Sequence, residues 1–204
     1  MLKLTIPAAL KEEFATVEAL WHSTAKTRRV DALMLSWVKY EKQLRRLFCF
    51  FIFQHPKIGA EQIDDVIAVL AESRSLYPET FIGGIAELGV TSVKDLLGER
   101  YVELSREVAR IKRYRNKLMH GQISGQNIKS SQLERDVLWI MDWAASLAAA
   151  AESAFGYDGF KRNTYRVARS ASKIEVGEYP FATPAELKAW ISVLVKKVKA
   201  SGGK

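Results

Sequence analysis

Apolar residues recur along this chain at steps of three and four, with polar residues between them. This period is that of amphipathic α-helices, whose apolar stripe faces a core. Capping residues and Gly or Pro breaks mark the ends of the stretches. The pattern predicts helices over about 7–28, 32–54, 60–73, part of 75–89, 92–97, 99–119, 130–155 and 184–198. We therefore expect an all-α fold, a helical bundle in which short loops favour an up-down arrangement.

The apolar positions also predict which face of each helix is buried. Three of the predicted stripes are Trp37, Leu44, Phe48 and Phe51; Ile63, Val66, Ile67 and Leu70; and Tyr101, Leu104, Val108, Ile111 and Leu118. The Gly83–Gly84 pair interrupts the short helix within 75–89, and no Gly-Lys-Ser/Thr follows it, so it is not a phosphate loop.

Two charged residues lie on these apolar stripes, Glu41 on the second predicted helix and Arg115 on the helix over 99–119. Burying a charge without a partner costs several kcal/mol or more, so each needs an explanation. Glu41 has two candidate partners: Arg45, four residues on in the same helix, or Arg115 on another helix. We predict that Glu41 and Arg115 approach within ion-pair distance.

The histidine with the most informative surroundings, His120, follows Arg115 by five residues at the predicted end of the helix. At about 100° per residue the two side chains lie about 140° apart on a regular helix, so they do not share a face. Asn116, four residues before His120, could hold one ring nitrogen. Gly121 would end the helix and let His120 turn toward Arg115, which would form a site.

The composition of the chain becomes more basic after a break marked by Gly156 and Gly159. We predict a helical domain over 1–155 and a basic C-terminal extension over 156–204 that packs on it, with a final helix at about 184–198. The extension could place four basic residues on one helical face, Arg162, Arg166, Arg169 and Lys173. Such a face suits the phosphates of a single-stranded nucleic acid, with nearby Tyr157, Phe160 and Tyr165 stacking on bases, or it is simply a solvated surface.

Composition narrows the classes further. The formal net charge of +8 is compatible with a polyanionic partner. Cys49 is the single cysteine, which excludes an intramolecular disulfide and favours a reducing compartment. The N-terminal residues lack a signal-peptide pattern, and the longest apolar run, 47–53, is too short to span a membrane. We expect a cytoplasmic protein. His22 and His55 have no partners at metal-ligand spacing, so we expect packing or surface histidines, no metal and no cofactor.

The Arg-Asn-x-x-x-His-Gly motif over 115–121 resembles the HEPN superfamily, whose signature is an arginine, four to six residues and then a histidine. A polar residue often follows the arginine in that family, and this favours Arg115 over Arg113, which fits the longer spacing to His120. The stretch "LSWVKYEKQLRRLF" looks like the acidic-residue helix of many such domains. The resemblance covers roughly residues 8–155.

The resemblance implies a metal-independent endoribonuclease, often the toxin of a toxin–antitoxin pair or a phage-defence effector, active as a homodimer with two motifs facing one cleft. It implies RNA as substrate, a cognate antitoxin as a further partner and no membrane association. The candidate residues are Arg115, His120 and Asn116 for catalysis, Glu41 in support, and Arg113, Lys117, Arg162, Arg166, Arg169 and Lys173 for RNA binding.

The residue types suit this chemistry. A histidine can act as general base on the ribose 2′-hydroxyl or general acid to the leaving oxygen, and an arginine can stabilise charge on the phosphate. Two other interpretations stay open. One is a non-catalytic HEPN-like module that binds RNA or a protein and uses Arg115 only structurally. The other is a helical interaction protein in which the motif is coincidental.

Overall fold

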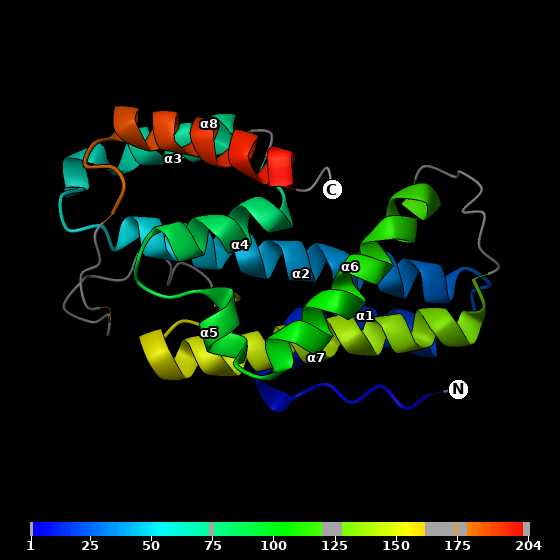
Figure 1. The fold of residues 1–204 in the computed structure, drawn as a ribbon. Coiled ribbons are helices and arrows are strands. Elements are labelled where there is room, and N and C mark those ends of the chain that lie inside the picture. The colour runs from blue at the N-terminus through cyan, green and yellow to red at the C-terminus, as the bar shows by residue number, and fades with distance from the viewer. Residues whose placement is uncertain (1, 74–75, 120–127, 162–173, 175–178, 202–204) are drawn as a thin grey trace. The chain divides into compact units, whose positions relative to one another are not determined.

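A computed structural model describes residues 2–73, 76–119, 128–161, 174 and 179–201 (Figure 1). Within these residues the secondary structure is entirely helical, which confirms the predicted all-α class. The α-helices are α1 (Lys11–His22), α2 (Arg28–Phe53), α3 (Ile63–Glu72), α4 (Pro78–Glu87), α5 (Val93–Leu97), α6 (Arg100–Met119), α7 (Ser130–Phe155) and α8 (Pro184–Ser201). Short 3-10 turns, Ala8–Leu10 and Ala60–Gln62, precede α1 and α3.

The prediction of one helix from Pro7 to Arg28 is wrong, because α1 ends at His22. Ser23 has extended backbone angles, φ −62° and ψ 156°, and its Oγ accepts a hydrogen bond from the Ala25 N–H at 3.0 Å. This local turn competes with further helix, a known property of serine side chains. The next helix starts earlier than predicted, at Arg28.

Several predicted helix starts are confirmed together with their caps. Ser92 Oγ accepts the Asp95 N–H at 3.0 Å before α5, and Thr183 Oγ1 accepts the Glu186 N–H at 3.2 Å before α8. A side-chain oxygen satisfies a backbone donor that the first turn leaves unpaired. Helices α6 and α7 also match their predicted bounds to within a residue. The predicted loop at 121–127 and the basic face at 162–173 lie outside the described residues.

The chain forms two compact units, each built from two separate stretches. Unit 1 comprises Met1–Lys42 and Leu97–Leu147, and unit 2 comprises Gln43–Leu96 and Ala148–Lys204. Helices α2 and α7 therefore each contribute residues to both units. The division into 1–155 and 156–204 that the sequence suggests stays a prediction.

The core of unit 1 is rich in aromatic rings from α1, α2 and α7. Trp21 and Trp143 are buried, and Tyr40 lies between two indoles, 5.1 Å from Trp37 and 5.4 Å from Trp143 between ring centroids. Such tilted and edge-on pairs add roughly 0.5–1.5 kcal/mol each beyond the area they bury. Tyr101 of α6 lies 6.4 Å from Trp143 between ring centroids, so these aromatic contacts also reach α6.

In unit 2, α3 and α4 both pack against α8, and Figure 1 shows α3 and α8 side by side. The predicted interruption at Gly83–Gly84 is instead part of α4. A Cβ atom at Gly84 would lie 2.5 Å from Phe48 Cε2 and 3.0 Å from Leu194 Cδ2. The glycine therefore permits a close approach of the α4 backbone to its neighbours, which offsets its poor helix propensity.

Candidate functional site

Arg115 extends from α6 toward α2, where its Nη2 donates to Glu41 Oε1 at 2.7 Å. This confirms the predicted approach of the two off-pattern charges. The Arg115 side chain is 15% exposed and that of Glu41 37% exposed, so the pair sits at the edge of the core of unit 1. The attraction between the two charges offsets part of the free-energy cost of removing them from water.

Trp37 contacts both members of this ion pair. Its indole Nε1 donates to the same Glu41 Oε1 at 2.7 Å, and the Arg115 guanidinium carbon lies 4.5 Å from the centroid of the Trp37 ring. An arginine over an indole face gains roughly 0.5–2 kcal/mol from the ring's negative face. The carboxylate and the ring together hold the plane of the guanidinium.

The other side of the guanidinium contacts its own helix. Arg115 Nη1 donates to Asn116 Oδ1 at 2.8 Å and contacts Met119 Sδ at 3.2 Å. Asn116 therefore lies directly beside Arg115, as the motif requires. The expected contact between Asn116 and His120 is not tested, because His120 lies outside the described residues.

The candidate RNA-binding residues divide into two groups. Arg113 and Lys117 are exposed on α6, on the helix that carries Arg115. The predicted basic face of 162–173 lies outside the described residues. The idea that Tyr157 and Phe160 stack on bases is wrong, because both are buried in unit 2 and Tyr157 stacks on Phe50 at 4.9 Å.

A second charged cluster, which we did not predict from the sequence, surrounds Asp136 on α7. This carboxylate is completely buried and accepts hydrogen bonds from Arg110 Nη2, from the Tyr114 hydroxyl and, at 2.8 Å, from Gln132 Nε2. Burial raises the pKa of Tyr114 and the hydrogen bond to Asp136 raises it further, so the phenol stays a proton donor.

Arg110, which donates to the same aspartate, stays in its charged form. Burial alone would lower its pKa, but the hydrogen bonds to Asp136 and Glu107 outweigh this and raise it. A signal for the cluster did exist in the sequence, since Asp136 falls on the same helical stripe as Leu133 and Ile140. A carboxylate there needs partners for the reason that Glu41 and Arg115 do.

The predicted character of the other histidines fits the structure. His55 is buried, its Nδ1 accepts the Lys57 N–H at 3.0 Å, and its Nε2 lies 2.5 Å from the Phe181 carbonyl oxygen. The Nε2 therefore carries the proton, and His55 is a core side chain. His22 is exposed. Among the described residues, no three His, Cys, Asp or Glu side chains are grouped as metal ligands would be.

Helix α6 holds two partly buried arginines against carboxylates, Arg110 against the buried Asp136 and Arg115 against Glu41 at the edge of the core of unit 1. An arginine at an edge, fixed in plane by neighbours, can bind a phosphate or carboxylate oxygen with little loss of side-chain freedom.

No helix in the described part of the chain is long and apolar enough to cross a bilayer. No family model, curated protein or solved structure matches the chain.

Proposed function

We propose that the protein is a metal-independent endoribonuclease that cleaves RNA by attack of the ribose 2′-hydroxyl on the adjacent phosphate. The observation that carries the proposal is the set of side chains that holds Arg115 in place. Its guanidinium is bound by Glu41, stacked on Trp37 and contacted by Asn116 at the C-terminal end of α6, directly before His120 in the chain. A preorganised cation five residues before a histidine in the chain offers the two groups that charge stabilisation and proton transfer at a phosphate need.

The roles follow from the side-chain chemistry. Arg115 stabilises the negative charge that builds on the phosphorus oxygens, and Glu41 keeps the arginine in position. His120 removes the proton from the 2′-hydroxyl or gives one to the leaving 5′-oxygen. Asn116 orients its neighbours and takes no part in proton transfer. The reaction leaves a 2′,3′-cyclic phosphate and a 5′-hydroxyl.

A homodimer would supply two histidines to one cleft, which provides the proton acceptor and the donor at the same time. The exposed Arg113 and Lys117 on α6 are suited to the RNA backbone, and Arg162, Arg166, Arg169 and Lys173 are proposed to extend that contact. A ribonuclease of this kind acts as a toxin or phage-defence effector, and a cognate antitoxin would be its protein partner.

The test is cleavage of a mixed RNA pool by the purified protein in excess EDTA, with analysis of the product ends. We expect cyclic phosphate ends, and a fall of at least about a hundredfold for His120→Ala and for Arg115→Ala. Asn116→Ala should cost less. Arg100→Gln is the matched control, because Arg100 also lies on α6 but forms an exposed ion pair with Asp142. Full activity of His120→Ala would refute the mechanism.

A second function is favoured by the same geometry. Glu41, Trp37 and Asn116 could hold Arg115 for structural reasons alone, as in a non-catalytic module that binds RNA or a protein. In that case the wild-type chain would bind RNA without cutting it. Arg115→Ala would then lower the free energy of unfolding, while His120→Ala would change neither stability nor binding.

A further inference from the structure

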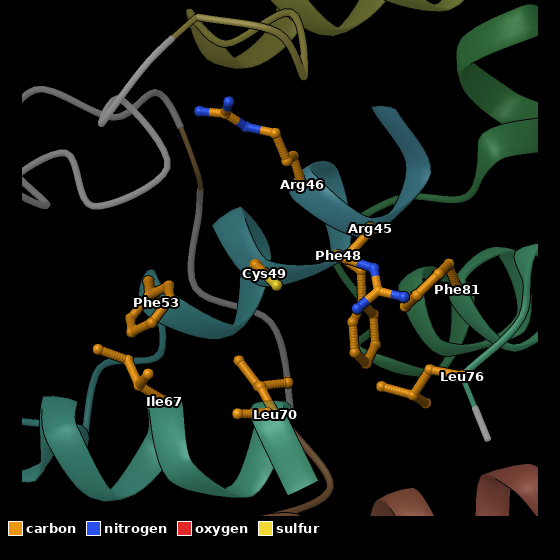
Figure 2. A pocket seen from close by; sticks show the side chains of 10 residues that line it. Arg45, Arg46, Phe48, Cys49, Phe53, Ile67, Leu70, Leu76 and Phe81 are labelled. Atoms are coloured by element: carbon orange, nitrogen blue, oxygen red, sulfur yellow. The ribbon is translucent and has the colours of Figure 1, made fainter. Parts of the chain in front are cut away.

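A pocket of about 350 Å³ opens in unit 2 between α2, α3 and the start of α4 (Figure 2). Its walls are mostly apolar, and none of the described residues that line it is acidic. Six of the lining residues are Phe48, Phe53, Ile67, Leu70, Leu76 and Phe81. Pockets of this size with apolar walls and a few polar groups are typical of small-molecule sites.

The walls expose more apolar surface than the helix pattern predicts. Ile67 and Leu70 were expected to be buried, yet both are half-buried, and so is Phe53. Helix α3 is buried mainly through Val66 of its predicted stripe, with Val69 in addition. Apolar side chains that converge on a hollow without filling it gain free energy when an apolar group enters.

Two arginines, Arg45 and Arg46, are among the described residues that line this hollow. Arg45 is exposed, and its guanidinium carbon lies 5.3 Å from the centroid of the Phe81 ring (Figure 2). Within the described part of the chain no carboxylate forms an ion pair with Arg45. The guanidinium of Arg46 donates to the Tyr157 hydroxyl at 2.8 Å. Among the described residues that line the pocket, Arg45 is therefore the cation placed to meet a ligand.

The shape and the charge together select the ligand. An apolar hollow suits a hydrocarbon chain, and a guanidinium at its edge suits a carboxylate, which it can bind through two parallel hydrogen bonds. A methylene group is close to a water molecule in size, about 30 Å³, so the pocket has room for about ten carbons. We propose that this pocket binds a medium-chain aliphatic carboxylate, with the chain among Phe53, Ile67 and Leu70 and the carboxylate on Arg45.

Cys49 provides a built-in reporter of occupancy. It is the single cysteine of the chain, and it lines the pocket. Burial raises the pKa of its thiol to about 11, so it reacts slowly with alkylating reagents near neutral pH. A bound chain would cover the sulfur and slow the reaction further.

The experiment uses the full-length protein, with decanoate as the probe at up to about 1 mM, the weak end of specific binding. N-ethylmaleimide labelling of Cys49, followed by mass spectrometry, and titration calorimetry are the two measurements. We expect saturable binding of decanoate with one site per chain, and protection of Cys49 that saturates with it. Decanol has the chain without the charge and should bind more weakly.

Variants separate the charge from the cavity. Arg45→Gln should weaken decanoate binding by about tenfold or more, the scale of one charge-assisted hydrogen bond, and leave decanol unchanged. Arg106→Gln removes the same charge from a site that is 73% exposed in unit 1, and should change nothing. Ala71→Phe, at an exposed position of the pocket wall, should abolish binding and keep the helical circular dichroism.

Three results would overturn the proposal. The first is the absence of saturable protection of Cys49 by decanoate. The second is an equal affinity for decanoate and decanol, or an equal effect of Arg45→Gln and Arg106→Gln, since either removes the carboxylate from the recognition. The third is protection of Cys49 that depends on protein concentration without any ligand, which would assign the pocket to a second copy of the chain.

Discussion

In unit 1, α6 pairs two arginines with carboxylates of its neighbours, Arg110 with the buried Asp136 and Arg115 with Glu41. In unit 2, the ion pair between α4 and α8, Glu87 with Lys197, leaves the lysine exposed, and the close contact of α4 is apolar, Gly84 against Phe48 and Leu194. Ion pairs fix direction but depend on both partners, because a buried charge left alone is costly. Apolar contacts depend on volume. The two units should therefore fail under different substitutions.

The largest effect is expected at Asp136. Replacing it with alanine leaves Arg110, Tyr114 and Gln132 without their common acceptor, and should lower the free energy of unfolding by about 3–5 kcal/mol. Urea denaturation measures the loss. Asp142→Ala is the matched control, since this aspartate of α7 is 37% exposed and its ion pair with Arg100 should contribute under about 1 kcal/mol. Similar losses for both variants would show that the burial of Asp136 does not decide the cost of removing its charge.

Unit 2 offers a test of volume without charge. Gly84→Ala places a Cβ against Phe48 and Leu194 and should cost about 1–3 kcal/mol. The Cβ of Gly83→Ala would lie 3.6 Å from Val198 Cγ2 and 3.9 Å from Leu194 Cδ1, both ordinary contacts, so this variant should stabilise the protein by up to about 1 kcal/mol through helix propensity. Thermal and urea denaturation of the pair give the sign of each change. A stabilising Gly84→Ala would show that the close approach is not required.

A smaller effect should appear as a dependence on pH in unit 1. Glu134 accepts hydrogen bonds from the Leu2 N–H at 2.9 Å and from Arg29 Nε at 2.7 Å. Burial alone would raise the pKa of Glu134, but these bonds outweigh it and the pKa lies below the ordinary value of 4.5. The charged form therefore contributes stability above about pH 4.5, and this contribution is lost as the pH falls through the lower folded-state pKa.

Glu134→Gln should accordingly cost about 1 kcal/mol at neutral pH and lose less stability than the wild type on acidification. The measurement is urea denaturation at a series of pH values. Glu12→Gln, at an exposed position on α1, serves as the control and should follow the wild-type curve. A Glu134→Gln curve parallel to the wild type would remove this residue from the acid response.

The smallest change in stability is expected at Glu41. Glutamine keeps the side-chain oxygen that accepts from Trp37 and Arg115, and the carboxylate is more than a third exposed, so the loss should stay under about 1 kcal/mol. Urea denaturation of Glu41→Gln and Asp136→Ala under the same conditions compares the two losses in free energy of unfolding. A loss as large as that of Asp136→Ala would make Arg115 another structural arginine and weaken the case for catalysis.

The sequence predicted the helices and their caps because period, Ser and Thr positions and glycine breaks are local properties. It also predicted the Glu41–Arg115 pair, since both charges stand out against apolar stripes. It did not reveal the use of Trp37, because a tryptophan on an apolar stripe looks the same whether or not its N–H has a partner. Asp136 also lies on an apolar stripe, but its charged partner Arg110 does not, so the pattern gave no reason to pair the two.

The pocket shows a second limit of pattern. The stripe of α3 predicted the direction in which Ile67 and Leu70 point, and they do point toward other apolar residues. A period cannot tell whether those residues fill the space opposite. The structure leaves that space partly empty, so both side chains stay half-buried.

The interleaving of the two units sets an order of events during synthesis. Unit 1 is complete only when residues 97–147 have been added to residues 1–42. Unit 2 is complete only when residues 148–204 have been added to residues 43–96. A ribosome adds roughly 5–20 residues per second, so the first stretches spend several seconds with their apolar faces uncovered. A nascent chain of this design depends on chaperones, or on transient pairing of its early helices, more than a chain whose units follow one another.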